Sequence, residues 1–350
     1  MNEKRLNILV LAGGESTERD VSLTSAKAVV GALTQGGHRV TIMDALDGRR
    51  LQLRADGFVD NDGRPVGVSG QLSPTILPMD GSALASQLAK AKAAGIEVAF
   101  SALHGGAGEN GRMQALLDML QIPYTGSPMA SSAIAMNKDI SKRVMQTLGI
   151  PTAEWLRYDR RTERTVDDIA REVAAVGLSL PQVVKPADGG STVGLTLVES
   201  ENQMPDAVRA ALAVSDSIII EKYFKGREIT IAVLDSKALP PVEIKPSHKL
   251  YDYTCKYTKG KSEYICPAKI DAAIVQQLSH DAVHFYETIG CRGYARIDFI
   301  VASVDDYICL ELNTLPGMTE LSLFPMAARA AGIEFGRLLE RLCLLGLERN

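Results

Sequence analysis

The sequence predicts a protein of the α/β class, with an N-terminal parallel sheet flanked by helices and a C-terminal part of α+β character. Residues 1–126 alternate between short buried-strand runs and amphipathic segments, which is typical of parallel α/β units. Residues 127–350 contain successive strands joined by glycine-rich or turn-like links, as hairpins are. Because 350 residues exceed the usual size of one core, we expect three units, at 1–126, 127–216 and 217–350.

The first unit begins with a buried strand, LNILVLAGG, that ends in two glycines. Ser22 is a good N-cap for a helix that runs to Gln35 with its apolar residues on one face, and Gly36-Gly37 would end it. The remaining elements expected in this unit are strands at 38–43 and 96–102, a hairpin within 59–68 that turns at Asp62-Gly63, and a helix at 82–94.

The second and third units are expected to be richer in strands. Asn137 can cap a helix that ends at Gly149, with Pro151 just beyond it. The other expected elements are strands at 182–185 and 194–198 around a loop at 186–193, strands at 217–224 and 228–234, a hairpin of 293–301 with 307–312, and a last helix at about 326–345.

The hairpin near the C-terminus carries two acidic residues and an amide. If its two-residue turn is centred on Val304-Asp305, Asp298 lies directly opposite Glu311, and Asn313 shares their face. Three oxygen donors in an apolar setting suit Mg²⁺ that is held jointly with substrate phosphates. A solvated polar face is the alternative interpretation.

Two further segments have the chemistry of a nucleotide site. The glycines and small hydroxyl residues of 186–193 would let backbone N–H groups approach phosphate, with Lys185 at the base and Lys138 at a helix start. The segment Glu221–Phe224 lies between two strands and offers backbone groups to an adenine edge, and Glu228 is near enough for ribose hydroxyls. Taken alone, the loop could be a flexible turn and the segment an edge strand.

Composition narrows the class of protein. A net charge of −4 gives no reason to expect nucleic acid or anionic membranes as partners. Five cysteines show no metal-ligand spacing and are odd in number, which fits a reducing compartment. No stretch resembles a signal peptide or a membrane span, so a cytoplasmic location is expected.

Short motifs in a specific order carry a resemblance over nearly the whole chain. They are Gly13-Gly14 with Glu18–Ser22, Ala102–Gly105, Tyr124–Ser127, Asn137-Lys138, Val184–Pro186, Gly190–Gly194, Tyr251–Tyr253 with Lys256-Tyr257, Gly293–Asp298, Glu311–Thr319 and Ser322-Leu323. In this order and spacing, the chain resembles the D-alanine–D-alanine ligases of the ATP-grasp superfamily.

The resemblance implies an ATP-dependent ligase that joins two D-alanines through an acyl phosphate for peptidoglycan synthesis. It implies two Mg²⁺ ions (Mn²⁺ is possible) at Asp298, Glu311 and Asn313, and a homodimer, which is usual in the family. Lys138, Lys185 and Lys256 would offset phosphate charge. Glu221, Lys222, Phe224 and Glu228 complete the implied ATP-binding set.

The resemblance also assigns residues to the two amino acid substrates. Glu18 would pair with the first ammonium, and Ser191 and Tyr257 would hydrogen-bond to Glu18 and close two loops over the site. His104 would line the first site, although a lone histidine is otherwise more often a packing residue. Arg296 and the backbone near Gly317 would stabilise the oxyanion, and Ser322 with Leu323 would receive the second substrate.

Three departures from the family pattern bear on loop closure and acceptor choice. Asn110 follows Glu109 where aspartate is usual, Gly189 stands where an acidic residue is common, and Thr254-Cys255 replace the usual Glu-Ala. A relative that couples D-alanine to D-serine or D-lactate is the nearest alternative, although Tyr257 favours an amine acceptor. A regulatory nucleotide-binding protein without turnover is a third reading, and the metal set argues against it.

Overall fold

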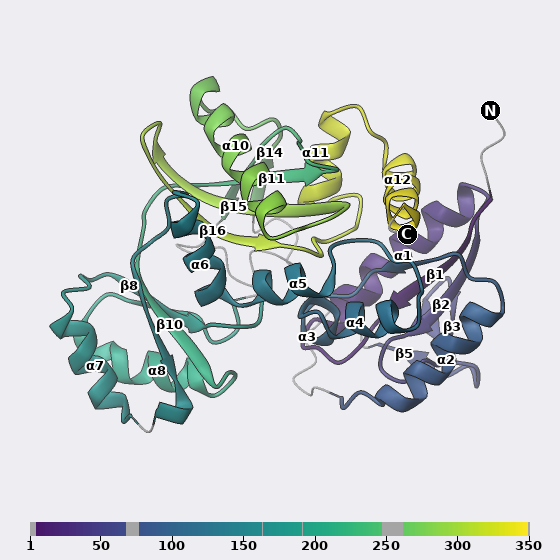
Figure 1. Ribbon diagram of the computed structural model, residues 1–350, viewed down its shortest axis with the longest axis horizontal. Helices are drawn as coiled ribbons and strands as arrows, with labels where there is room; N and C mark the ends of the chain where they lie inside the picture. Colours follow the sequence, from purple (N-terminus) through teal and green to yellow (C-terminus); the bar gives the residue numbers. More distant parts are fainter. Residues whose placement is uncertain (1–4, 68–76, 163, 191, 247–261, 349–350) are drawn as a thin grey trace.

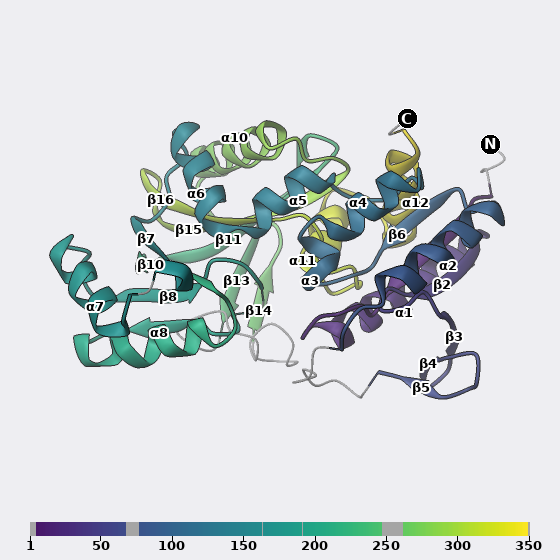
Figure 2. The ribbon, with the colours of Figure 1, turned by 60° about the horizontal axis from the view of Figure 1, so that its bottom comes forward.

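Three sheets organise the chain in the computed structural model, and helices cover their faces (Figure 1). The structure describes residues 5–67, 77–162, 164–190, 192–246 and 262–348. Figures 1 and 2 show the three sheets as three lobes. The lobe that contains β7–β10, second in chain order, lies at one end of the molecule, and the N-terminal lobe lies at the other. No helix in these described ranges is long and apolar enough to cross a membrane.

The first sheet has the strand order β5-β4-β3-β2-β1-β6. Its centre is parallel, because β1 pairs in parallel with both β2 and β6, which confirms the parallel α/β prediction for this part. The segment after β2 extends the sheet with antiparallel strands, and the predicted turn at Asp62-Gly63 joins two of them. The elements of this lobe are β1 (Asn7–Ala12), α1 (Arg19–Gln35), β2 (Arg39–Asp44), β3 (Arg50–Arg54), β4 (Gly57–Val59), β5 (Pro65–Val66), α2 (Gly81–Ala93), β6 (Val98–Ser101), α3 (Gly106–Glu109) and α4 (Arg112–Met119).

Helix α1 begins at Arg19, so the prediction that Ser22 caps it is wrong. Glu18 stands at the N-cap position, and the Ser22 hydroxyl is fully buried inside the first turn. The Ser22 Oγ accepts a hydrogen bond from Gly13 N (2.9 Å) and donates one to Ala102 O (2.8 Å). Ser22 therefore ties α1 to the ends of β1 and β6, where the glycine turn and His104 lie.

The second sheet is antiparallel, with the order β7-β10-β8-β9, and α7 and α8 cover one face (Figure 1). Helix α6 precedes it, and its predicted cap is confirmed, because Asn137 Oδ1 accepts from Ile140 N at 3.1 Å. The elements are α5 (Met129–Met136), α6 (Lys138–Thr147), β7 (Trp155–Asp159), the 3₁₀ turn η1 (Arg160–Thr162), α7 (Val166–Ala175), β8 (Gln182–Pro186), β9 (Thr196–Val198), the 3₁₀ turn η2 (Glu201–Gln203), α8 (Met204–Leu212) and β10 (Ser217–Lys222).

The third sheet has the order β14-β13-β11-β15-β16, with β12 paired to β11. Helix α10 packs on it, and its apolar residues form a core with β11, β15 and β16. The elements are β11 (Arg227–Leu234), β12 (Lys237–Ala238), β13 (Val242–Pro246), β14 (Ser262–Ile265), α10 (Ala272–Thr288), β15 (Tyr294–Ser303), β16 (Asp306–Asn313), α11 (Leu323–Ala330) and α12 (Phe335–Leu347).

The chain returns to the first lobe at its end. The prediction of one helix over 326–345 is wrong, because Gly332 takes a positive φ of 81° and separates α11 from α12. The buried residues of α11 and α12, including Phe324 and Leu338, belong to the same hydrophobic core as β1, β6 and α1. Figure 1 shows α12 against α1. This shared core brings the segment after β16 close to the strand ends of the first sheet.

Candidate functional site

The hairpin of β15 and β16 carries the acidic residues as predicted. Asp298 pairs directly with Glu311, and Arg296 pairs with Asn313, so all four side chains lie on one face. Arg296 donates to both carboxylate oxygens of Asp298, at 2.9 and 2.8 Å. Thr230, opposite Asp298 on β11, donates to Asp298 Oδ1 at 2.6 Å. The side chain of the buried Asp298 is therefore oriented by Arg296 and Thr230.

The donor set of this face fits a hard cation. The face offers two carboxylates, of Asp298 and Glu311, and the Asn313 amide. A group of three or more His, Cys, Asp or Glu residues that could hold a metal ion is absent from the described part of the chain. Asn313 Oδ1 also accepts a hydrogen bond from Leu315 N at 3.0 Å, which fixes the side chain. Mg²⁺ is commonly held in this way, by one or two carboxylates and the oxygens of substrate phosphates.

A cluster of buried charge lies between α6 and the second sheet. The Glu221 carboxylate, on β10, contacts the Nζ atoms of Lys185 (2.5 Å) and of Lys142 (3.1 Å). Burial alone would raise the pKa of Glu221, but the charges of Lys185 and Lys142 outweigh it and lower the pKa to about 2. Two cations thus share one carboxylate, and this net positive charge favours an anionic ligand nearby.

Lys138 and the glycine-rich loop meet beside this cluster. Lys138 Nζ donates to Gly189 O (2.7 Å), and Lys138 N donates to Ala187 O (2.7 Å). The first turn of α6 therefore lies against the loop that follows Lys185, and both groups of backbone donors predicted to approach phosphate are next to each other.

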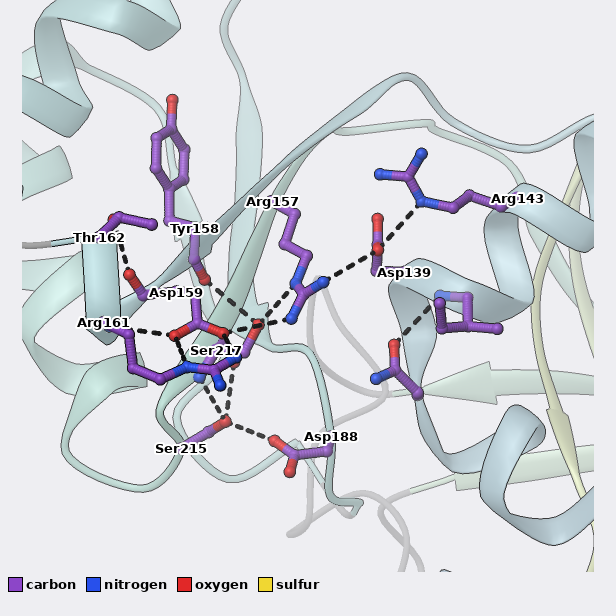
Figure 3. Close-up of polar contacts among 12 residues, drawn as sticks. Asp139, Arg143, Arg157, Tyr158, Asp159, Arg161, Thr162, Asp188, Ser215 and Ser217 are labelled. Atoms are coloured by element: carbon purple, nitrogen blue, oxygen red, sulfur yellow. Dashed lines mark hydrogen bonds and ion pairs between the residues drawn. The ribbon is translucent and has the colours of Figure 1, made fainter. Parts of the chain in front are cut away.

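A chain of polar contacts anchors the same loop from the other side (Figure 3). The Ser215 hydroxyl contacts Asp188 and donates to Ser217 O at 2.7 Å. Arg157 reaches the Ser217 hydroxyl at 3.0 Å and Asp139, the neighbour of Lys138, at 3.6 Å. The start of the loop and the start of α6 are thereby linked through β7 and β10.

Glu18 and His104 come together at the strand ends of the first sheet. Both side chains are buried, and His104 Nε2 lies 3.0 Å from the Ser25 hydroxyl. A methyl group at Gly190 would lie 3.2 Å from Glu18 Oε2, so the glycine-rich loop passes directly beside this carboxylate. A small cavity lies next to His104, with Gly13, Gly14 and Leu103 in its wall. Burial lowers the pKa of His104, which favours the neutral imidazole.

Glu109 is a site residue that the sequence analysis did not select. Its Oε1 lies 3.9 Å from His104 Nδ1. Burial, followed by the charge of Glu18, raises the pKa of Glu109 to about 8, and Glu311 contributes in the same sense. The charges of Glu18, at the first sheet, and of Glu311, on the acidic hairpin, therefore both act on Glu109.

The raised pKa of Glu109 should make the unfolding free energy of the protein depend on pH. Its carboxyl holds a proton in the folded state up to about pH 8 and loses it near 4.5 when unfolded, so the unfolding free energy should fall as pH rises between these values. Glu109→Gln should remove part of this slope in denaturant titrations at several pH values, whereas Glu348→Gln, at an exposed position, should leave it unchanged. Equal slopes in Glu109→Gln and wild type would contradict the raised pKa.

The residues predicted for the second substrate also lie together. A methyl group at Gly317 would lie 3.0 Å from the Ser322 hydroxyl, which accepts from Thr319 N at 3.1 Å. Ser322 is the N-cap residue of α11, and Leu323 begins that helix with a buried side chain. The Ser322 hydroxyl and the helix N-terminus therefore form one small polar corner.

The residues predicted for the adenine and ribose lie between the last two residues of β10 and the start of β11. Lys222 is exposed, Phe224 is half-buried, and Glu228 lies half-buried on β11, across the passage from the second sheet to the third. Backbone bonds from Lys222 N to Glu154 O (2.9 Å) and from Tyr223 N to Pro181 O (3.0 Å) hold this passage.

Three predicted site residues, Ser191, Lys256 and Tyr257, lie outside the described residues. Conversely, the sequence analysis missed Lys142, Thr230 and Glu109. Lys142 stands four residues after Lys138 on the same helix, and that spacing was the available signal.

Comparison with known proteins assigns both halves of the chain to one family. Residues 7–127 match the model of the D-ala D-ala ligase N-terminus, and residues 144–344 match that of the D-ala D-ala ligase C-terminus. A D-alanine–D-alanine ligase from Geobacter sulfurreducens is 39% identical over 342 residues, which cover 97% of this chain and 94% of that protein. One from Desulforudis audaxviator is 38% identical over 344 residues, with 97% and 98% covered.

Solved structures agree with the sequence comparison. The D-alanine–D-alanine ligase from Bacillus anthracis complexed with ATP has a TM-score of 0.75 at 27% identity and covers 98% of each chain. That from Coxiella burnetii has a TM-score of 0.76 at 25% identity, covering 99% of this chain and 95% of the other. With both family models matched over most of its length, the chain belongs to the D-alanine–D-alanine ligase family.

Proposed function

We propose that this protein joins two D-alanines to D-alanyl-D-alanine with ATP hydrolysed to ADP and phosphate. The observation that carries the proposal is the direct pairing of Asp298 with Glu311 on one face of the hairpin. The charge of Glu311 acts on Lys138 and on Glu109, which lies beside His104. The named relatives, and a structural neighbour complexed with ATP, support the same activity.

The reaction has two steps in this proposal. A carboxylate oxygen of the first D-alanine attacks the γ-phosphorus, the bond to ADP breaks, and an acyl phosphate forms. The amine of the second D-alanine then attacks the acyl carbon, loses a proton, and expels phosphate. Arg296 and the backbone N–H near Gly317 stabilise the oxyanion at the tetrahedral centre, a role typically worth about 3–4 kcal/mol per donor.

The γ-phosphate carries charge that the site must neutralise. Asp298, Glu311 and Asn313 would hold two Mg²⁺ ions, or Mn²⁺, which when bound offset the charge of the ATP phosphates. Lys138, Lys185 and Lys256 add fixed positive charge. The contacts of Lys138 with the glycine-rich loop support this role, because they bring a cation and backbone donors to one point.

The adenine and ribose are proposed to lie along the passage from β10 to β11, against Glu221, Lys222 and Phe224, with Glu228 at the ribose. Oε2 of Glu221 is buried, and its described partner is the Nζ atom of Lys142, at 3.1 Å. A carboxylate oxygen can accept more than one hydrogen bond, so this atom can also accept one from an adenine amino group.

The amino acid subsites are proposed from the resemblance to the family. Glu18 would pair with the first ammonium and His104 would line that subsite, while Ser191 and Tyr257, outside the described residues, would hydrogen-bond to Glu18 and exclude water from the acyl phosphate. The position of Gly190 beside Glu18 supports this arrangement. Ser322 and Leu323 receive the second substrate at the N-terminus of α11.

The chain is proposed to consist of three functional units and to assemble into a homodimer. We propose functional units at 1–126, 127–216 and 217–350, the last two forming the nucleotide-binding ATP-grasp part. The protein is proposed to act in the cytoplasm as a homodimer, on small-molecule substrates, in supply of peptidoglycan precursors.

The proposal is tested by ADP release with D-alanine, D-serine, D-lactate and L-alanine in parallel, with products identified by mass. D-Alanyl-D-alanine should be the dominant product with D-alanine alone. ADP release that requires D-serine or D-lactate as a second substrate would overturn the acceptor assignment. ATP binding without ADP formation under any condition would overturn the ligase proposal.

A further inference from the structure

The buried cluster between α6 and the second sheet contains one more cation than the proposed reaction uses. Lys185 belongs to the proposed phosphate contacts, and Glu221 to the adenine contacts. Lys142 has no role in either, yet its side chain is 2% exposed and lies 3.1 Å from Glu221. A buried lysine that the proposed reaction does not use needs a physical reason, because burying an ammonium group is costly.

Lys142 is fixed by three neighbours. Its Nζ donates to the Thr152 hydroxyl at 2.8 Å, and that hydroxyl donates to Cys309 O on β16 at 3.1 Å. The same Nζ lies 5.1 Å from the centre of the Trp155 ring, within the range of a cation–π contact. Together with Glu221, these contacts hold Lys142 between helix α6 and the strand that carries Glu311.

Lys185 is placed differently. Its side chain is 11% exposed, and its described ion pair is the one with Glu221, at 2.5 Å. It stands on β8, directly before Pro186 and the glycine-rich loop. Of the two cations on Glu221, Lys185 is therefore the one that can turn toward a phosphate, and Lys142 is the one that stays.

We propose that Lys142 is a positioning residue that neutralises Glu221 when ATP binds, so that Lys185 is free to exchange the carboxylate for a phosphate. The inference rests on the proposed ATP site. Without Lys142, the exchange would leave Glu221 as a buried carboxylate with no cation, and this state is strongly unfavourable. Lys142 thus acts on ATP through Glu221 and Lys185.

Lys142→Met should weaken ATP binding at least about tenfold, as measured by calorimetry without D-alanine, and should raise KM for ATP more than it lowers kcat. Lys142→Arg, which keeps the charge, should restore most of the affinity. Lys90→Met, which removes an exposed lysine from α2, should leave ATP binding unchanged.

A second comparison separates this role from simple packing. In a Glu221→Gln background there is no carboxylate to neutralise, so adding Lys142→Met should change ATP affinity by less than about twofold. This comparison also decides the matter if Lys142→Met alone folds poorly, because neither Glu221→Gln nor the double variant contains an unpaired Glu221 carboxylate.

Two results would overturn the role of Lys142. One is an ATP dissociation constant for Lys142→Met within about twofold of wild type, and the other is a tenfold loss that persists in the Glu221→Gln background. Neither result concerns ADP formation by the wild-type protein with D-alanine, which alone decides the proposed function.

Discussion

Replacing Glu311 with glutamine should reduce ADP formation by about a hundredfold or more while the protein stays folded. The change is nearly isosteric but removes one of the two carboxylates that face each other across β15 and β16. If these residues hold the metal ions, the variant should also need much more Mg²⁺ for half-maximal rate. The measurement is the rate of ADP release over a Mg²⁺ titration.

The matched control for this experiment is Asp306→Asn, at the exposed start of the same strand. It removes the same charge from the same hairpin, and both rate and Mg²⁺ requirement should match wild type. Thermal midpoints of both variants should lie within a few degrees of wild type. Full turnover by Glu311→Gln at low Mg²⁺ would show that the hairpin is not the metal site.

Replacing Arg296 with lysine should lower kcat by about 10²–10³-fold with a smaller change in KM for ATP. The Arg296 guanidinium donates to both oxygens of Asp298 and carries its five N–H donors in one plane. A lysine keeps the charge but cannot reproduce this planar, two-point geometry. The measurement is steady-state kinetics with saturating D-alanine.

Arg292→Lys serves as the control, since Arg292 is exposed and precedes the same strand. It should behave as wild type. A kcat for Arg296→Lys close to that of wild type would exclude Arg296 from transition-state stabilisation. A loss confined to KM for ATP would instead assign it to nucleotide binding.

The pairing of Asp298 with Glu311 could be predicted, but only because two register shifts in the hairpin cancel each other. Counting from the pair Ser303–Asp306 places Asp298 opposite Glu311, and the structure has this pair. Between them, however, the register shifts by one residue near Val301 and shifts back between Asp298 and Phe299. A single bulge would have put Glu311 on the other face, so the count alone did not determine the outcome.

Other features depend on contacts that sequence patterns do not contain. Ser22 has the chemistry of an N-cap, but helix α1 starts at Arg19. The Ser22 hydroxyl instead bridges the ends of two strands. Lys142 and Glu221 are 79 positions apart in the sequence, so their contact follows only from the packing of α6 on the second sheet. Gly332, by contrast, was a readable signal for the break between α11 and α12.

The most direct test of the proposed mechanism follows an oxygen atom. D-Alanine labelled with ¹⁸O in both carboxylate oxygens is turned over with ATP and Mg²⁺, and the inorganic phosphate is analysed by mass. Attack of the carboxylate on the γ-phosphorus and expulsion of phosphate by the second amine should leave one ¹⁸O atom in each phosphate formed with the dipeptide. Phosphate without the label, formed at the same rate as the dipeptide, would contradict an acyl phosphate intermediate.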